Sequence, residues 1–272
     1  MRARKRFGQH FLEAPWVARV LDAASPDPAD VFLEIGPGQG ALTIPLAARV
    51  ARVVAVEVDR DLAARLARHA PPNVHVVTAD VLKADLTRLL ADGPPALRRR
   101  VVGNLPYNVS TPIIFRLLET ARGLHPPHDA TLMVQREVAD RLVAGPGGGD
   151  YGVLSVLTQV RADVTRAFDL PPGAFRPVPK VRSSLVRLVF RPERVLAAHS
   201  ATFNRLVRTV FSQRRKVLAN ALKPFADAAG VSVAAALEEA DLDGRRRPET
   251  LQLMELTRLA AVFATAAWPP VL

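Results

Sequence analysis

Four apolar runs in this sequence each end in residues able to hold a nucleotide-like ligand. In chain order, these ends are Gly36-Pro37-Gly38-Gln39-Gly40, Glu57-Val58, Asp80-Val81 and Asn104-Leu105-Pro106-Tyr107. Together they supply backbone N–H groups, two carboxylates, and an amide beside an aromatic ring. The carboxyl ends of parallel strands meet at one edge of a sheet, and ligands of α/β proteins bind there. We therefore expect the four groups to surround a single site.

The first three groups indicate a methyl donor. A glycine-rich turn lets a ligand approach the backbone closely. Its spacing is Gly-x-Gly-x-Gly, not the Gly-x-Gly-x-x-Gly of a pyrophosphate clamp, and this favours S-adenosylmethionine over a dinucleotide. Glu57 follows about 20 residues later, where an acid accepts hydrogen bonds from ribose hydroxyls, and Asp80 is expected to accept from the adenine amine. A tight turn without a ligand, and helix N-caps for the acids, are the alternative interpretations.

The fourth group suits a flat heterocycle with an amino group. An adenine amine is a poor nucleophile because its lone pair is delocalised into the ring. The Asn104 side-chain oxygen and the Leu105 carbonyl could accept its two hydrogens and turn the lone pair toward a methyl group, so orientation and dipolar stabilisation would suffice without a strong base. Pro106 stiffens the turn, and Tyr107 offers a stacking face. A proline turn capped by an asparagine is the alternative.

A base that reacts at its amine must leave a duplex or come from a single-stranded loop. We therefore expect an aromatic face on each side of it. Phe175, in the proline-rich segment 171–180, is predicted to supply the face opposite Tyr107, and Lys180 to contact a phosphate. Ordinary core packing is the alternative for Phe175.

The elements that position these residues alternate along most of the chain. Residues 7–12 resemble a turn, and 151–160 a helix. Strands are expected over 31–35, 53–57, 74–77, 100–103, 131–134, 164–168 and 184–190, with helices between most of them. This pattern predicts a mostly parallel, seven-stranded sheet with helices on both faces, its last two strands antiparallel at one edge. Strand signals stop beyond Pro192. We predict a cofactor-binding domain over residues 1–194 and a small all-helical, RNA- or ribosome-binding domain over 195–272.

The charge of the chain indicates a polyanionic partner. It contains 37 Lys and Arg against 26 Asp and Glu, a formal net charge of +11. The basic residues cluster without acids in the first ten positions and over 199–223, which favours nucleic acid over the alternative of an ordinary basic enzyme. We predict RNA contacts from Arg4, Lys5, Arg6, Lys180, Arg205, Arg208, Arg214, Arg215 and Lys216.

Several classes of protein are excluded by composition. The chain has no cysteine, so disulfide frameworks, thiolate zinc sites and cysteine nucleophiles are absent. Six histidines lack the spacing of metal ligands, and we predict no metal. No apolar run approaches the roughly 18 residues that span a bilayer, and the basic N-terminus has no apolar core of a secretory signal. We expect a soluble, cytoplasmic protein without a membrane partner.

With these residues in place, the chain resembles the KsgA-type ribosomal RNA adenine dimethyltransferases. The segments that match lie in order between residue 7 and about residue 222: Gly8-Gln9-His10-Phe11-Leu12, Glu34-Ile35-Gly36-Pro37-Gly38-Gln39-Gly40-Ala41-Leu42-Thr43, Glu57-Val58-Asp59, Ala79-Asp80, Asn104-Leu105-Pro106-Tyr107-Asn108-Val109-Ser110-Thr111-Pro112, Gln135-Arg136-Glu137-Val138-Ala139, Phe175-Arg176-Pro177-Val178-Pro179-Lys180-Val181 and Arg214-Arg215-Lys216.

The resemblance implies a Rossmann-like class I methyltransferase fold and a specific reaction. Two methyl groups pass from S-adenosylmethionine to the N6 of each of two adjacent adenosines, in a hairpin loop near the 3′ end of small-subunit (16S) rRNA. The family acts on a pre-ribosomal subunit, and we expect this chain to be a monomer. By position, the cofactor would contact His10, Leu12, Gly36, Gly38, Glu57, Val58, Asp80, Val81 and Asn104. Asn104 to Tyr107, with Phe175, would hold the target base. The family often has Asn in place of His10, and a histidine can also donate a hydrogen bond to the cofactor's carboxylate.

Three other functions remain open at this point. Related enzymes that methylate large-subunit rRNA and confer macrolide resistance usually carry Asn-Ile-Pro-Tyr and lack the proline after Ser-Thr, so Leu105 and Pro112 favour the small subunit. A non-catalytic RNA-binding assembly or transcription factor would not need the complete set of cofactor residues. A DNA adenine methyltransferase would act on naked duplex DNA.

Overall fold

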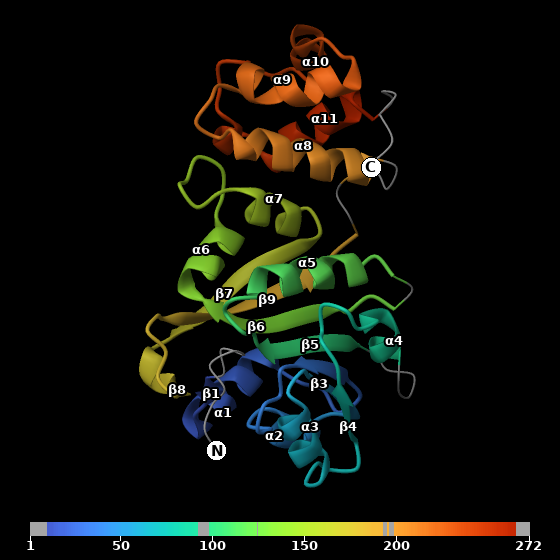
Figure 1. The fold of residues 1–272 in the computed structure, drawn as a ribbon, viewed down its shortest axis with the longest axis vertical. Helices are drawn as coiled ribbons and strands as arrows, with labels where there is room; N and C mark the ends of the chain where they lie inside the picture. The colour runs from blue at the N-terminus through green and yellow to red at the C-terminus, as the bar shows by residue number, and fades with distance from the viewer. Residues whose placement is uncertain (1–9, 92–97, 124, 193–194, 196–198, 265–272) are drawn as a thin grey trace. The chain divides into compact units, whose positions relative to one another are not determined.

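Seven strands form one sheet with the predicted doubly wound connectivity (Figure 1). The computed structural model describes residues 10–91, 98–123, 125–192, 195 and 199–264. The strands are β2 (Val31–Ile35), β3 (Arg52–Glu57), β4 (Val74–Thr78), β5 (Arg99–Asn104), β6 (Asp129–Gln135), β7 (Ala162–Leu170) and β9 (Ser183–Phe190). Their order is β4-β3-β2-β5-β6-β9-β7. The first five pair in parallel and β9 is antiparallel to β6, so the predicted mostly parallel seven-stranded sheet is confirmed.

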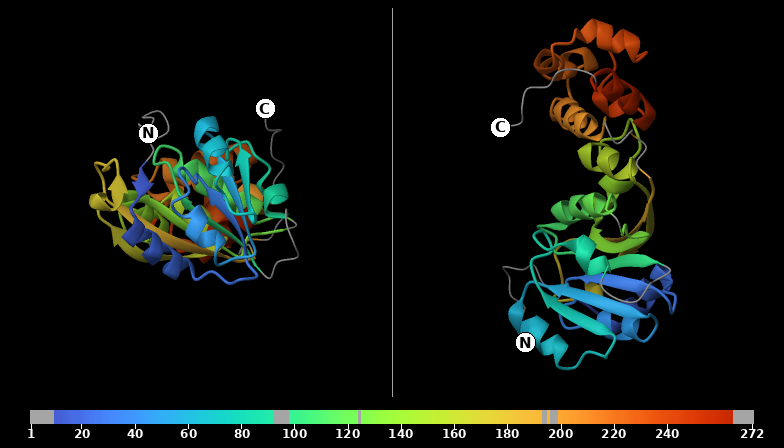
Figure 2. Two further views of the ribbon diagram at one scale, coloured as in Figure 1. Left: turned by 90° about the horizontal axis from the view of Figure 1, so that it is seen from below. Right: turned by 90° about the vertical axis from the view of Figure 1, so that its right-hand side faces the viewer.

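Helices cover both faces of this sheet, as predicted (Figures 1 and 2). They are α1 (Ala14–Ala24), α2 (Thr43–Ala47), α3 (Arg60–Ala67), α4 (Leu86–Ala91) and α5 (Ser110–Thr120). One face packs α1, α2 and α3 against Phe32, Ala55 and Val102 in a single apolar core. Successive strand residues point to opposite faces, so Leu33 and Ile35 project to the other face, where α4 contacts β2 and α5.

The amino ends of the central strands are closed by paired charges. Arg100, at the start of β5, is fully buried and donates to Asp129 from Nε (2.7 Å) and to Asp30 from Nη1 (3.0 Å). Arg98 and Arg187 add ion pairs to Asp30 and Asp129. Buried charges are stable only when they are paired in this way. The carboxyl ends of the same strands carry Glu57 and Asp80, for which the described residues show hydrogen bonds to backbone N–H groups.

The segment before α1 is a short strand and not the predicted turn. In β1 (Phe11–Leu12), Phe11 pairs with Arg176 and Leu12 with Phe175 of β8 (Phe175–Arg176), in antiparallel register. The N–H of Glu13 continues the ladder to the carbonyl of Ala174 at 2.9 Å. A two-residue strand has no periodicity to detect, and its partner lies more than 160 positions away.

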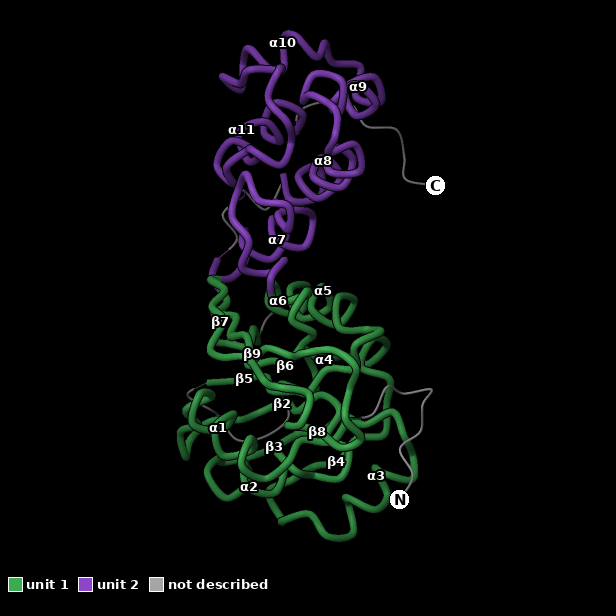
Figure 3. The backbone as a smooth tube through the Cα atoms, turned by 90° about the vertical axis from the view of Figure 1, so that its left-hand side faces the viewer, with its two compact units in different colours: residues 1–139, 163–190 green, residues 140–162, 191–272 purple. Residues whose placement is uncertain are grey.

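The chain divides into two compact units, coloured separately in Figure 3. The first comprises residues 1–139 and 163–190, and the second 140–162 and 191–272. Helix α6 (Arg136–Val143) carries the chain from one unit to the other. The second unit contains α7 (Val153–Gln159), α8 (Ser200–Ser212), α9 (Leu218–Ala229), α10 (Val233–Glu239), the 3-10 turn η4 (Pro248–Thr250) and α11 (Leu253–Val262). Across the described residues, every helix is too short or too polar to cross a bilayer.

This second unit differs from the predicted C-terminal domain, residues 195–272, because it also takes in 140–162 and 191–194. The buried hydroxyl of Tyr151 donates to the carbonyl of Leu251 at 3.1 Å, and its ring meets Phe211 edge-on at 5.7 Å. The Arg161 guanidinium donates to Ser200 at 3.1 Å. These contacts join segments that lie far apart in sequence, so a boundary drawn where strand signals stop does not include them.

Candidate active site

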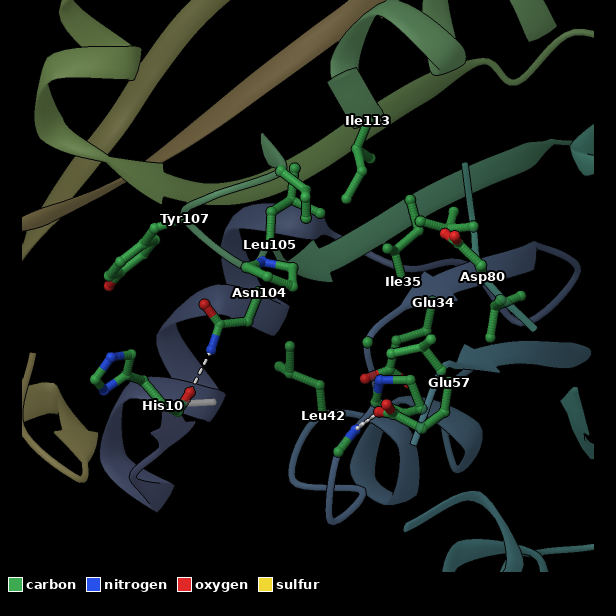
Figure 4. Close-up of a pocket in the computed structure, with 18 of the residues that line it drawn as sticks. His10, Glu34, Ile35, Leu42, Glu57, Asp80, Asn104, Leu105, Tyr107 and Ile113 are labelled. Carbon is green, nitrogen blue, oxygen red and sulfur yellow. Dashed lines mark hydrogen bonds between the residues drawn. The ribbon is translucent and has the colours of Figure 1, made fainter. Parts of the chain in front are cut away.

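A cavity of about 250 Å³ lies at the carboxyl ends of β2, β3, β4 and β5. Figure 4 shows side chains from all these strands converging on it. Its lining includes every predicted cofactor residue and the whole of the predicted base-holding tetrapeptide: His10, Leu12, Gly36, Gly38, Glu57, Val58, Asp80, Val81, Asn104, Leu105, Pro106 and Tyr107. All belong to the first compact unit. The structure therefore brings together the four groups that the sequence places at successive strand ends.

The glycine turn after β2 forms one wall of the cavity. Gly36 and Gly38 have φ values of 69° and 57°, a backbone conformation that residues with a Cβ rarely adopt. A Cβ on Gly38 would lie 2.9 Å from the ring of Phe11. Glycine at position 38 therefore allows the turn to lie against β1, and the N–H of Gly38 is directed at Glu57.

Glu57 is held rigidly at the end of β3. It is buried, and its two oxygens accept hydrogen bonds from the N–H of Gly38 (3.0 Å) and of Asp59 (2.9 Å). Burial raises the pKa of Glu57, while these two backbone hydrogen bonds act in the opposite direction. Both bonds also fix the carboxylate plane. Each carboxylate oxygen has a further lone pair for a ligand hydroxyl.

Asp80 occupies the matching position after β4. Its Oδ1 accepts from the N–H of Leu82 at 3.0 Å, and its carbonyl accepts from Lys83 and Ala84 at 2.9 Å. The side chain is half-buried and lines the cavity next to Val81. These hydrogen bonds hold Asp80 in place beyond the end of β4, where its carboxylate can accept a hydrogen bond from an amine.

The amide of Asn104 is oriented by the N-terminal strand. Its Nδ2 donates to the backbone carbonyl of His10 at 2.6 Å (Figure 4). Because a carbonyl oxygen can only accept, this bond fixes which end of the amide is the donor. The acceptor Oδ1 is thereby left for a ligand. The N–H of Leu105 bonds to the carbonyl of Met133 at 3.1 Å, which ties the tetrapeptide to β6.

Tyr107 is held at both its ring and its hydroxyl. The hydroxyl lies 2.6 Å from Oγ of Ser183, and burial raises the pKa of Tyr107, so the phenol stays protonated. Its ring stacks on that of His10, with centroids 5.6 Å apart and planes inclined by 21°. Nδ1 of His10 lies 2.6 Å from the carbonyl of Pro177 and must be the protonated nitrogen. Nε2 is then the ring nitrogen that can serve a ligand.

Phe175 does not occupy the position that the sequence predicts for it. It is fully buried in the core with Leu12, Leu170 and Leu185, and it is absent from the cavity lining. Its neighbours in β1 and on the sheet face supply enough apolar surface to bury the ring. The ring that faces Tyr107 is that of His10. Lys180 is exposed and also lies outside the lining.

The cavity also contains a carboxyl group to which we assigned no role from sequence. Glu34 lies within β2, is almost fully buried and lines the cavity. Burial, together with the negative charge of Glu57, raises the pKa of Glu34 to about 7. An acid inside the apolar run 31–35 is the signal for it in the sequence, although the run by itself predicts only a strand.

The predicted RNA-binding cations have different environments. Arg214 is paired with Glu249 at 2.9 Å and donates to the carbonyl of Gly149 at 2.9 Å, so its place is within the second unit. Arg215 and Lys216 are exposed in the turn between α8 and α9, and Arg208 is exposed on α8. Arg205 is half-buried. Arg4, Lys5 and Arg6 lie outside the described residues.

Comparison with known proteins decides the family. The family model for ribosomal RNA adenine dimethylase matches residues 1–258. The chain belongs to this family. The ribosomal RNA small subunit methyltransferase A of Pseudomonas fluorescens is 45% identical over 98% of this chain and 96% of its own length. The protein of the same name from Aromatoleum aromaticum is 49% identical over 84% of each chain.

Solved structures agree on the fold. A dimethyladenosine transferase from Plasmodium falciparum superposes with a TM-score of 0.76, at 24% identity over 92% of this chain and 96% of its own. The 23S rRNA methyltransferase ErmE gives 0.65, at 29% identity over 93% and 99%. The class I methyltransferase fold with a helical C-terminal part is thus confirmed.

Family membership confirms the chemistry predicted from the strand ends. The chain is an rRNA adenine dimethyltransferase that uses S-adenosylmethionine. Among the described residues, no three His, Asp or Glu side chains gather in a way that could hold a metal ion.

Proposed function

We propose that this enzyme dimethylates the N6 amines of two adjacent adenosines in a loop near the 3′ end of small-subunit rRNA, within a pre-ribosomal subunit. The choice of subunit is supported by relatives named for the small subunit, which align over nearly the whole chain at 42–45% identity. The reaction rests on one observation above all, the fixed amide of Asn104 at the end of β5. Its free acceptor faces the cavity that holds the donor-binding acids.

The residues that line the cavity fit S-adenosylmethionine in their chemistry. Glu57 would hold the ribose hydroxyls, Asp80 and Val81 the adenine, and Gly36 and Gly38 would let the backbone approach the ligand. His10, through Nε2, and Leu12 would contact the methionine end. When bound, the cofactor supplies an electrophilic methyl group on a positively charged sulfur. The near-complete burial of Glu57 and its two backbone hydrogen bonds mean that this acid is set before the ligand arrives.

The target amine is prepared by two acceptors. Oδ1 of Asn104 and the carbonyl of Leu105 accept its two hydrogens, which withdraws the nitrogen lone pair from the ring and aims it at the methyl group. Both acceptors are immobile, because Nδ2 of Asn104 is bonded to His10 and the N–H of Leu105 to Met133. Preorganised dipoles of this kind stabilise the developing charge without a strong base.

The ring of the target base is held by Tyr107. Its hydroxyl is anchored on Ser183, so its free face is presented at a fixed angle. Pro106 holds the backbone between the two acceptors and this ring. The stack of His10 on Tyr107 covers one side of the tyrosine. A target base that displaces His10 from this stack, or adds to the stack, can pack on the aromatic face of Tyr107 without any contribution from Phe175.

The RNA itself is held by exposed cations. Arg208, Arg215 and Lys216 of the second unit and Lys180 of the first are accessible for phosphate contacts, and we assign the second unit to rRNA or ribosome binding. We also propose that the enzyme acts as a monomer. A cytoplasmic location is proposed because ribosomal subunits are the substrate.

Primer extension tests the substrate directly, because dimethylated adenines stop the polymerase. Small ribosomal subunits and large ribosomal subunits, each lacking the modification, are incubated with enzyme and S-adenosylmethionine. We expect a stop near the 3′ end of the small-subunit rRNA and none in the large-subunit rRNA. A stop only in the large subunit would favour the macrolide-resistance type of activity. Transfer to naked duplex DNA in a parallel reaction would contradict the assignment to rRNA.

A further inference from the structure

The cavity contains one carboxyl group that the mechanism above does not use. Glu34 is 2% exposed, and its Oε2 has no hydrogen-bond partner among the described residues. A buried carboxyl oxygen without a partner costs free energy in the empty protein. Because Glu34 lines the cavity, a ligand there can supply the missing partner.

The register of the sheet fixes where this group lies. Glu34 pairs with Ala55 of β3 and with Val102 of β5. Side chains two residues apart on a strand share a face. Glu57 and Asn104, each two residues further along, therefore project to the same face as Glu34. Glu34 lies on β2, which runs between β3 and β5, and it comes one pleat before Glu57 and Asn104. Figure 4 shows Glu34 near Glu57.

The position of Glu34 would correspond to the sulfur of the bound cofactor. With ribose hydroxyls on Glu57 and the target amine at Asn104, the sulfur that joins ribose to the transferred methyl would lie between these two side chains. The methyl donor carries a positive charge at this sulfur. After transfer the sulfur is a neutral thioether, because the electron pair of the broken carbon–sulfur bond remains on it. The reaction therefore removes one positive charge from the region above Glu34.

We propose that Glu34 is the group by which the pocket distinguishes the sulfonium cofactor from its thioether product. Its unpartnered oxygen interacts with the positive charge of S-adenosylmethionine and finds no such charge in S-adenosylhomocysteine. The carboxylate thus strengthens binding of the substrate and favours release of the product. This inference rests on the proposed orientation of the cofactor.

Proton binding gives the proposal a second readout. The pKa of Glu34 is raised to about 7, mainly by burial and in part by the charge of Glu57 on β3, while Thr43 of α2 acts in the opposite direction. Asp80, after β4, His10, before β1, and Tyr107, after β5, are the other titratable groups among the described residues of the lining. Near pH 7 the empty pocket therefore holds Glu34 partly protonated. A bound cation lowers the pKa of Glu34 and releases a proton, whereas the neutral thioether leaves the proton in place.

Isothermal titration calorimetry in buffers of different ionisation enthalpy measures both effects. S-adenosylmethionine and S-adenosylhomocysteine are titrated into the full chain, into Glu34→Gln, and into Glu239→Gln as a control at an exposed carboxylate of α10. We expect Glu34→Gln to lower the preference for S-adenosylmethionine by about tenfold, the equivalent of one pKa unit. Proton release on binding S-adenosylmethionine should disappear in this variant and persist in Glu239→Gln.

A folded Glu34→Gln protein with the wild-type affinity ratio and proton release would overturn the proposal. Should this variant not fold, the wild type alone decides. Its preference for S-adenosylmethionine should rise between pH 6 and pH 8 as Glu34 ionises, and a constant ratio across that range would overturn the idea equally. Absence of S-adenosylmethionine binding to the wild type would instead contradict the proposed function, so the two failures are distinguishable.

Discussion

Two exposed cations in the turn between α8 and α9 give the sharpest prediction about RNA binding. Arg215 and Lys216 have accessible side chains, and replacing both by alanine removes two candidate phosphate contacts. Each contact to single-stranded nucleic acid contributes about 0.7 to the slope of log affinity against log salt, so the slope should fall by about 1.4. Between 50 and 200 mM salt, this corresponds to about a sevenfold smaller loss of affinity.

The neighbouring Arg214 supplies a matched control. It is bound to Glu249 and to the carbonyl of Gly149, so Arg214→Ala should cost about 1 kcal/mol of stability and leave the salt slope unchanged. Fluorescence anisotropy of a labelled rRNA fragment across a salt series gives the slopes, and urea unfolding gives the stability. An unchanged slope in the double variant, or a reduced one in Arg214→Ala, would refute the assignment of these three residues.

Three further predictions follow from the pocket. Gly38→Ala adds a Cβ 2.9 Å from the Phe11 ring at a φ of 57°, a strain of about 1–2 kcal/mol, and calorimetry should show about a tenfold or greater loss of cofactor affinity. Ser183→Ala removes the 2.6 Å hydrogen bond to Tyr107, worth about 1 kcal/mol. It should slow methyl transfer about fivefold with unchanged cofactor affinity, and Tyr107→Phe should match it. The difference in free energy of unfolding between Glu34→Gln and the wild type should be about 3 kcal/mol more favourable to the variant at pH 8 than at pH 4. In the folded wild type Glu34 has a pKa of about 7, whereas in the unfolded chain its ordinary value is about 4.5. Below about pH 4.5 the carboxyl is protonated in both states and costs no stability. As the pH rises through 7, the wild type loses stability because the unfolded chain ionises this group more readily than the folded protein does. Urea unfolding at both pH values measures this, and equal effects of the substitution at both would contradict the buried position of the carboxyl.

The strand ends were predictable because local rules decide them. An apolar run that ends in glycine or an acid is visible within a few residues, and the alternation of strands and helices determines that these ends share one edge of the sheet. Glu57, Asp80 and Asn104 line one cavity for this reason. The family motifs then indicate which cofactor and which reaction these strand ends serve, namely S-adenosylmethionine and the dimethylation of adenosine N6.

The remaining features depend on contacts between distant segments. Nothing local distinguishes a phenylalanine that grips a base from one that completes a core, and the pairing of β8 with β1 buries Phe175. Similarly, three consecutive cations look alike in sequence. Glu249, 35 residues away, and the carbonyl of Gly149 set Arg214 apart from its neighbours. Glu34 was visible as an acid in an apolar strand, but its role follows only from the register with β3 and β5.

The most direct test of the catalytic site is the rate of methyl transfer by Asn104→Ala on small ribosomal subunits. The variant loses the acceptor that orients the amine, which at comparable sites costs about 10²–10³ in rate. Transfer of labelled methyl groups is measured at saturating cofactor, with calorimetry to verify that S-adenosylmethionine still binds. We predict a rate reduced by about two to three orders of magnitude with cofactor binding largely intact. A variant that binds the cofactor and methylates the subunit at the wild-type rate would contradict the account.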